Sequence, residues 1–172
     1  LSASGKNGGA QMVYILMICM VVPLLLLIPM LEKQSRLLLG FVLGGMVLAV
    51  CAYEINSVVC ALFSLSGPEL SITAAPIVEE ILKALPVLFF ALFVSDDRKL
   101  VLQLAMASGI GFAILENAFL LITYVDQVDI VWAVVRGIST SLSHGICTMI
   151  VGNGIVYVRK QKKLFYTGTF AL

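Results

Sequence analysis

The sequence predicts an all-α fold, a polytopic bundle of transmembrane helices with five full spans and the start of a sixth. Hydrophobic residues make up 60% of the 172 residues and charged residues only 12%, whereas a soluble domain is about 45–50% apolar and about 25% charged. Five segments reach the roughly 20 apolar residues that a spanning helix needs. Backbone groups in lipid have to be satisfied within the element, so these segments are helices and not strands.

The predicted spans cover most of the chain after an N-terminal tail of residues 1–10. In order, they are residues 11–31, 37–63, 72–94, 100–125 and 130–158. The third begins after the loop near residues 64–71, which contains Ser66, Gly67 and Pro68. Pro76 lies in the first turns of this span, where a missing N–H costs little. Residues 164–172 begin an apolar run that is too short to cross the bilayer. We therefore expect residues 11–172 to form one membrane domain, cut short inside a sixth helix.

Basic residues mark alternate ends of these spans and predict their orientation. Lys33 and Arg36 separate the first span from the second, and Arg98 and Lys99 separate the third from the fourth. A further cluster follows the fifth span: Arg159, Lys160, Lys162 and Lys163. The other two connections carry no Lys or Arg. Since basic loops stay in the cytoplasm, we predict a multi-pass protein of the cell membrane with an extracytoplasmic N-terminus.

Several titratable side chains lie within the predicted spans, where charge is costly. They are Glu54, Glu79, Glu80, Lys83, Glu116, Arg136 and His144. Each charged group costs at least about 2.5 kcal/mol at the bilayer centre, so a set of this size needs mutual pairing and marks a functional site. Counting about 1.5 Å per residue from the outer helix ends places the carboxylates and the imidazole in one layer of the outer half of the membrane. The sequence therefore predicts a shared intramembrane cavity.

Spacing within each helix supports this convergence. Lys83 follows Glu79 by four residues and Glu80 by three, so one lysine can neutralise part of the pair. Arg136 and His144 are eight residues apart and share one side of the fifth span. The fourth span contains two glycines, Gly109 and Gly111, that permit close helix contact just before the turn that carries Glu116.

The intramembrane carboxylates outnumber the intramembrane cations. Four glutamates face one lysine and one arginine, which leaves two negative charges without a partner. Either some carboxyls hold protons, or a divalent cation supplies the balance. Carboxylate and imidazole groups suit zinc. On the second alternative we predict zinc as a cofactor, with Glu79, Glu116 and His144 as its ligands; a carboxylate acting as base without a metal is the competing version.

Structural interpretations of the same residues remain open. The paired acids could form only an ion-pair network with Lys83 that sets helix register, and His144 could be only an interhelical hydrogen bonder. Glu54 matches no motif and could form a structural bridge to Arg136. A serine nucleophile beside the histidine is disfavoured, because neighbours on one helix rarely give in-line geometry; the serines concerned are Ser139, Ser141 and Ser143.

Three segments in order resemble the motifs of PrsW-type intramembrane proteases, distant relatives of the CAAX prenyl proteases. PIVEEILK is similar to the family's EExxK motif, GIGFAILENAF to its FxxxEN motif, and RGISTSLSHGICTMIVGNG to its intramembrane histidine motif. The resemblance covers roughly residues 74–156. It implies a helical membrane protease domain in which Glu79, Glu80, Glu116 and His144 are catalytic, supported by Lys83, Asn117 and Arg136.

The resemblance also implies a substrate and a reaction. A carboxylate, Glu79 before Glu80, would take a proton from a water that attacks the scissile peptide bond of a membrane-anchored substrate. The expected partners are a single-pass membrane protein, as in first-site cleavage of an anti-sigma factor, and the lipid bilayer, with no nucleic acid. Family members usually carry a further polar motif on a later helix, often with a second histidine, and this chain has only His144.

Two other classes of function use the same residues. A proton- or ion-coupled transporter or channel also needs intramembrane acids, but it would place them along a pathway and not in one layer. A catalytically silent member of the family would bind a membrane partner without cleaving it.

Overall fold

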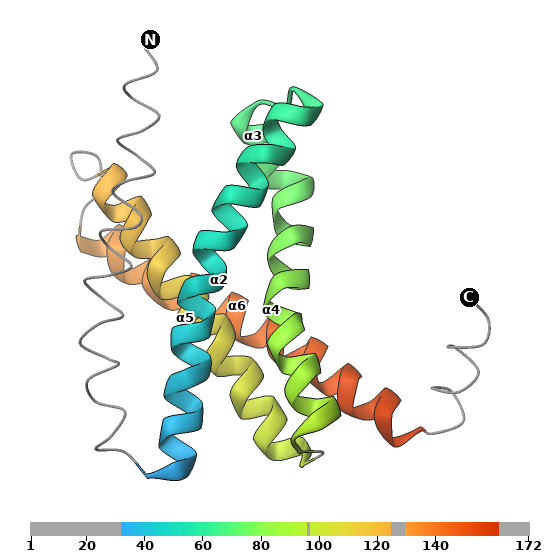
Figure 1. Cartoon of the computed structure of the whole chain (residues 1–172). Coiled ribbons are helices and arrows are strands. Elements are labelled where there is room, and N and C mark those ends of the chain that lie inside the picture. The colour runs from blue at the N-terminus through green and yellow to red at the C-terminus, as the bar shows by residue number, and fades with distance from the viewer. Residues whose placement is uncertain (1–31, 96, 125–129, 162–172) are drawn as a thin grey trace.

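The described part of the computed structural model, residues 32–95, 97–124 and 130–161, is helical and contains no strand. Its elements are α2 (Lys33–Phe63), α3 (Gly67–Ile72), α4 (Ala74–Phe93), α5 (Arg98–Thr123) and α6 (Ile130–Lys160). Figure 1 shows α2 and α4 rising side by side to α3, with α5 and α6 crossing behind them. The all-α prediction is confirmed, while the first predicted span and the start of the sixth lie outside the described residues.

Three of these helices are long and apolar enough to cross a membrane: α2, α5 and α6. α4 has 20 residues, close to the length that the hydrocarbon layer requires. It carries Glu79, Glu80 and Lys83, so its composition alone does not mark it as a span. Large apolar side chains stay exposed on outward faces, among them Leu62, Phe89 and Ile138. Such a surface fits contact with lipid.

The connection between α2 and α4 is more structured than the sequence predicted. The third helix was expected to begin at residue 72, but a separate short helix, α3, precedes it and α4 begins at Ala74. Ser66 and Glu69 form a capping box, and Pro68 lies in the first turn of α3, where a proline loses no hydrogen bond. These local signals start a helix of their own before the apolar run begins.

α5 is the central helix of the bundle and packs most extensively against α6 and α2. Its small residues allow backbones to approach. A Cβ added at Gly111 would meet the carbonyl oxygen of Val42 on α2, and a Cβ added at Gly109 would meet that of His144 on α6. The predicted role of these two glycines is therefore confirmed.

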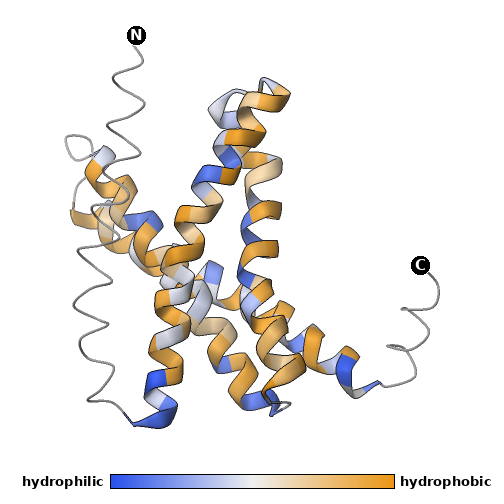
Figure 2. Cartoon of the chain, viewed as in Figure 1, coloured by the Kyte–Doolittle hydropathy of each residue, from blue (hydrophilic) through white to orange (hydrophobic). Residues whose placement is uncertain are grey.

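The core has two clusters of buried apolar residues, one toward each half of α5. The first surrounds Leu104 and Val156 with residues from α4, and the second surrounds Met46 and Leu115. Figure 2 shows polar residues at the start of α2, at the turn between α4 and α5, and at the end of α6, on the side away from α3. Basic ends thus gather on one side of the bundle, as the loop charges predicted.

Candidate functional site

Three helices meet at Lys83 of α4. Its side chain is 0% exposed, and its Nζ donates to Glu80 Oε1 at 2.6 Å. The same ammonium lies 2.6 Å from Nδ1 of His144 on α6. It also lies 4.5 Å from the centre of the Phe112 ring on α5, a distance at which the ring face attracts a cation.

His144 is held at both ring nitrogens. Nδ1 faces Lys83, and Nε2 lies 2.9 Å from Oε2 of Glu116 on α5. Because an ammonium has donors and no acceptor, Nδ1 accepts from Lys83, and the ring proton lies on Nε2 and donates to Glu116. The imidazole therefore links a cation on α4 to a carboxylate on α5 in a fixed direction.

Arg136 completes the group from α6, two turns before the histidine. Its Nη2 donates to Glu116 Oε1 at 3.1 Å, and its guanidinium carbon lies 5.5 Å from the centre of the Trp132 ring. Glu116 thus accepts from Arg136 with one carboxylate oxygen and from His144 with the other. The ion pair of Arg136 is with Glu116, whereas the sequence suggested a bridge to Glu54, which is exposed on α2.

Helix packing explains why His144 reaches this position. Gly109 lets α5 approach the backbone of α6 at His144, since any side chain there would collide with its carbonyl group. The hydroxyl of buried Thr148 donates to the same carbonyl oxygen at 2.8 Å. The Phe112 ring packs against the imidazole, with centroids 5.2 Å apart. The first residue of the FxxxEN motif is this phenylalanine, so the motif contained a signal for its role that sequence reasoning did not use.

The structure brings five of the predicted site residues into one hydrogen-bonded chain: Glu80, Lys83, His144, Glu116 and Arg136. Asn117 is buried, and its Oδ1 has no hydrogen-bond partner among the described residues. It lies outside the chain, and the role predicted for it stays a prediction.

Each carboxylate in the hydrogen-bonded chain has a cation as its partner, and the carboxylate of Glu79 lies outside these pairs. Glu80 pairs with Lys83, and Glu116 pairs with Arg136. Glu79 is half-buried and forms no hydrogen bond or ion pair with any residue in the described ranges. The structure thus distinguishes the two adjacent acids of α4, which the sequence could only treat as a pair.

Glu79 and Glu116 share the wall of a cavity of about 440 Å³ between α2, α3 and α5, to which α4 contributes Glu79. This volume lies within the range of about 300–1,000 Å³ that is usual for ligand sites. The other residues of the wall are mostly apolar, and α3 contributes Leu70 and Ser71. The unpaired carboxylate therefore faces a space that can hold part of a substrate.

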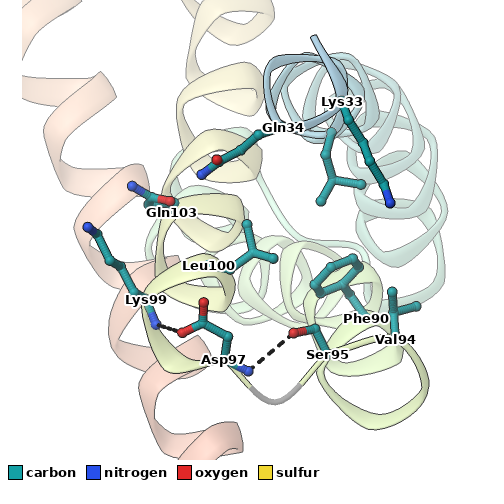
Figure 3. Close-up of a pocket in the computed structure, with 10 residues that line it drawn as sticks. Lys33, Gln34, Phe90, Val94, Ser95, Asp97, Lys99, Leu100 and Gln103 are labelled. Carbon is teal, nitrogen blue, oxygen red and sulfur yellow. Dashed lines mark hydrogen bonds between the residues drawn. The ribbon is translucent and has the colours of Figure 1, made fainter.

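A larger cavity, of about 640 Å³, lies at the other end of the bundle and away from these carboxylates. Figure 3 shows it between the start of α2, the end of α4 and the start of α5, with Lys33 and Lys99 at its edge and Phe90 and Leu100 in its wall. Asp97 there accepts from the backbone N–H of Lys99 at 3.0 Å and so caps α5. Its size alone would favour this cavity as the substrate-binding site, but none of the predicted site residues lines it.

A zinc ion finds two suitable donor atoms in the group. His144 Nε2 and Glu116 Oε2 are 2.9 Å apart, somewhat closer than the roughly 3.3–3.5 Å that separates two ligands of a tetrahedral zinc. A metal could thus replace the proton between them with a small movement. Nδ1 would then carry the ring proton, so Lys83 would have to release its contact. The described residues contain no cluster of three such donors, and Glu79 as the third ligand stays a prediction.

The geometry disfavours a serine nucleophile. The two nitrogens of His144 are occupied by Lys83 and Glu116, and Ser139 donates its hydroxyl to the backbone oxygen of Arg136. Ser143 is exposed beside the histidine. In the part of the chain that the structure describes, no serine hydroxyl is hydrogen-bonded to the imidazole.

Comparison with known protein families matches residues 33–172 to a family described as PrsW family intramembrane metalloproteases. The matched residues include all five residues of the hydrogen-bonded chain and every residue that lines the 440 Å³ cavity. Neither a search of curated proteins nor a search of solved structures finds a match.

Proposed function

Because the chain belongs to the PrsW family of intramembrane metalloproteases and is therefore a membrane protease, we propose that it hydrolyses peptide bonds of membrane-anchored proteins with Glu79 as the general base. The observation that carries this assignment is the pairing of the carboxylates. Glu80 and Glu116 are each held by a cation, whereas Glu79 has no hydrogen-bond or ion-pair partner in the described ranges and lines the 440 Å³ cavity. A base has to reach the water and accept its proton, and a carboxylate without a cation partner is better suited to that task.

The five residues of the hydrogen-bonded chain hold the site in position. Lys83 fixes Glu80 and the imidazole, and Arg136 fixes Glu116. The buried ammonium also supplies positive charge close to the reacting groups, where an oxyanion would develop during attack on a carbonyl. Glu79 would accept the proton of the attacking water and pass it to the leaving amine. In this arrangement, five side chains organise the site and a sixth, Glu79, performs the proton transfer.

A metal ion fits the same site in its chemistry. Zinc held by His144 Nε2 and Glu116 would polarise the scissile carbonyl and lower the pKa of a bound water. In the version with Glu79 as the third ligand, Lys83 no longer contacts Nδ1 and the role of base passes to Glu80, the second candidate; in the version without that ligand, Glu79 remains the base. The family description supports a metal. Zinc as the particular ion is our proposal, based on the imidazole and carboxylate donors.

The proposed substrates are single-pass membrane proteins, for example an anti-sigma factor that undergoes its first cleavage here. The cavity is walled in part by α3, on the side away from the basic helix ends. With those basic ends in the cytoplasm, the site lies in the outer half of the membrane and the N-terminus is extracytoplasmic. Substrate fragments should therefore end in the outer part of the substrate helix.

A reconstituted cleavage assay tests this function. The purified full chain in liposomes is given a single-pass substrate, and wild type is compared with Glu79→Gln and His144→Ala, each with and without a zinc chelator. We expect both variants to lose cleavage by at least about a hundredfold, the usual size of a general-base effect, and chelation to abolish cleavage reversibly with zinc.

Two matched variants serve as controls. Glu54→Gln removes an exposed carboxylate of α2 that belongs to none of the three motifs, and Ser143→Ala removes the exposed hydroxyl beside the histidine. Both should cleave like wild type. Cleavage that needs Glu79 but ignores chelation would favour a carboxylate base without a metal. Ion flux lost in Glu116→Gln, with no cleavage by wild type of any substrate, would favour a transporter.

A further inference from the structure

We propose that the cavity between α2, α3 and α5 binds the apolar substrate residue next to the scissile bond, and that the Asn56 side chain binds the unwound substrate backbone. This inference rests on the proposed function, because it names the substrate contact of the same site. It assigns a specificity pocket and a substrate-binding residue on α2, a helix that carries none of the three motifs.

The wall of the cavity identifies the chemistry of its occupant. Its apolar part includes Tyr53, Phe112, Leu115 and Phe119, and the two carboxylates Glu79 and Glu116 lie in the same wall. An occupant therefore contacts apolar groups while it lies against the proposed base. A large apolar side chain such as Leu or Phe satisfies this surface, whereas a carboxylate would meet like charge in a site of low dielectric.

The substrate backbone also has to keep hydrogen-bond partners when it is cleaved. A membrane-spanning substrate enters as a helix, in which each peptide carbonyl is hydrogen-bonded and shielded. Hydrolysis requires the chain to unwind at the scissile bond, and this frees N–H and C=O groups that are costly to leave unpaired away from water. A protease site in the membrane therefore needs polar groups to replace these hydrogen bonds.

Asn56 is placed to provide such a replacement. It lines the cavity from α2, and its Oδ1 is buried without a hydrogen-bond partner among the described residues. A buried carbonyl oxygen in that state carries a desolvation cost that a ligand N–H would relieve. A side-chain amide offers both an acceptor and donors, which matches the N–H and C=O groups of an unwound peptide.

The first test separates substrate binding from structural support. Asn56→Leu keeps the approximate size of the side chain and removes its amide. Since that amide oxygen has no partner among the described residues, the variant should melt at the wild-type temperature or above it. Its kcat/KM should fall about tenfold, mainly through KM, as expected for one lost hydrogen bond.

Asn153→Leu is the matched control. This asparagine of α6 accepts from Arg98 Nε at 2.9 Å and lies near the start of α5, outside the cavity. The control should melt at a lower temperature and keep the wild-type KM. An Asn56→Leu enzyme with a lowered melting temperature and an unchanged KM would overturn the proposal.

The second test concerns the side-chain pocket. Ala49 lines the cavity from α2 and is half-buried, whereas Ala61 is exposed on the same helix and outside the cavity. After the cleavage position has been mapped by mass spectrometry, substrates with Leu, Phe, Ala or Asp on either side of the bond are compared. Wild type and Ala61→Leu should prefer Leu or Phe over Ala at one of the two positions by about tenfold and should reject Asp. Ala49→Leu should lose or reverse the preference for the large residue.

These outcomes distinguish failure of the proposed protease function from failure of the pocket assignment. If wild type cleaves no substrate, the proposed function fails and the pocket assignment fails with it. If wild type cleaves but Ala49→Leu slows all substrates equally, then the cavity holds a lipid chain or another part of the enzyme, and only this inference is overturned.

Discussion

The Nζ atom of Lys83 lies 2.6 Å from Nδ1 of His144, although the two residues are 61 positions apart in the sequence. This contact joins the first and third motifs directly. It also determines which nitrogen of the imidazole carries the proton, because the ammonium can only donate. The lysine is therefore a positioning residue whose influence extends through His144 to Glu116.

Replacing Lys83 with methionine should preserve the approximate length of the side chain and remove the hydrogen bond that positions His144. We expect Lys83→Met to lose cleavage by at least about a hundredfold, because both the imidazole and Glu80 lose their common donor. The measurement is the cleavage rate in liposomes. Lys99→Met, at an exposed lysine at the start of α5, is the control and should be fully active. Wild-type cleavage by Lys83→Met would show that the contact has no role in the reaction.

The two adjacent acids of α4 should differ in their effect on stability. Glu80→Gln removes the charged partner of a fully buried lysine, and we expect it to cost about 1–2 kcal/mol, discounted because the carboxylate is partly exposed. Glu79→Gln removes no hydrogen bond within the described structure and should leave the melting temperature unchanged while abolishing cleavage. Thermal unfolding in detergent measures this difference. Equal destabilisation by both variants would contradict the pairing described above.

Close packing at Gly109 should be essential for the position of His144. Gly109→Ala places a methyl group against the His144 carbonyl, and we expect a cost of about 1–3 kcal/mol from overpacking together with a loss of cleavage. Gly137→Ala is the matched control, because nothing lies within 4 Å of the added Cβ. That variant should gain about 0.5–1 kcal/mol from improved helix propensity. The two melting temperatures should thus move in opposite directions.

The capping box of α3 should respond to pH. Hydrogen bonds from the hydroxyl and the backbone N–H of Ser66 hold the pKa of Glu69 below its ordinary value of 4.5. A lowered pKa in the folded state means that the cap stabilises α3 above the unfolded pKa and loses its effect as the pH falls through the folded value. Amide exchange of residues 67–72, corrected for intrinsic rates, should therefore accelerate below about pH 4.5. Ser66→Ala should raise the exchange rates at neutral pH and flatten this dependence.

Much of the site could be predicted from the sequence, for a physical reason. Charges inside apolar helices are so costly that they mark functional positions without any structure. Helical spacing then shows which of them share a face, so Lys83 and the two acids of α4 could be grouped in advance. The glycines of α5 could likewise be recognised as points of close helix contact.

Other features had no signal in the sequence. Asn56 is neutral, and a single amide in an apolar helix has neither the cost of a charge nor a characteristic spacing. The separate helix α3 is not part of the sequence prediction, because its capping residues lie in the stretch predicted as the loop between the second and third spans. The choice of Glu116 as the partner of Arg136 depends on how α5 and α6 pack, which local patterns do not describe.

The sequence by itself determined the helical membrane class and the chemical groups of the site, because burial cost and helical periodicity act locally along the chain. Only the tertiary structure decided which carboxylate lacks an ion-pair partner among the described residues and which nitrogen of His144 carries the proton. Those properties depend on distances of about 3 Å between side chains on different helices. Such distances arise only when α4, α5 and α6 have packed against one another.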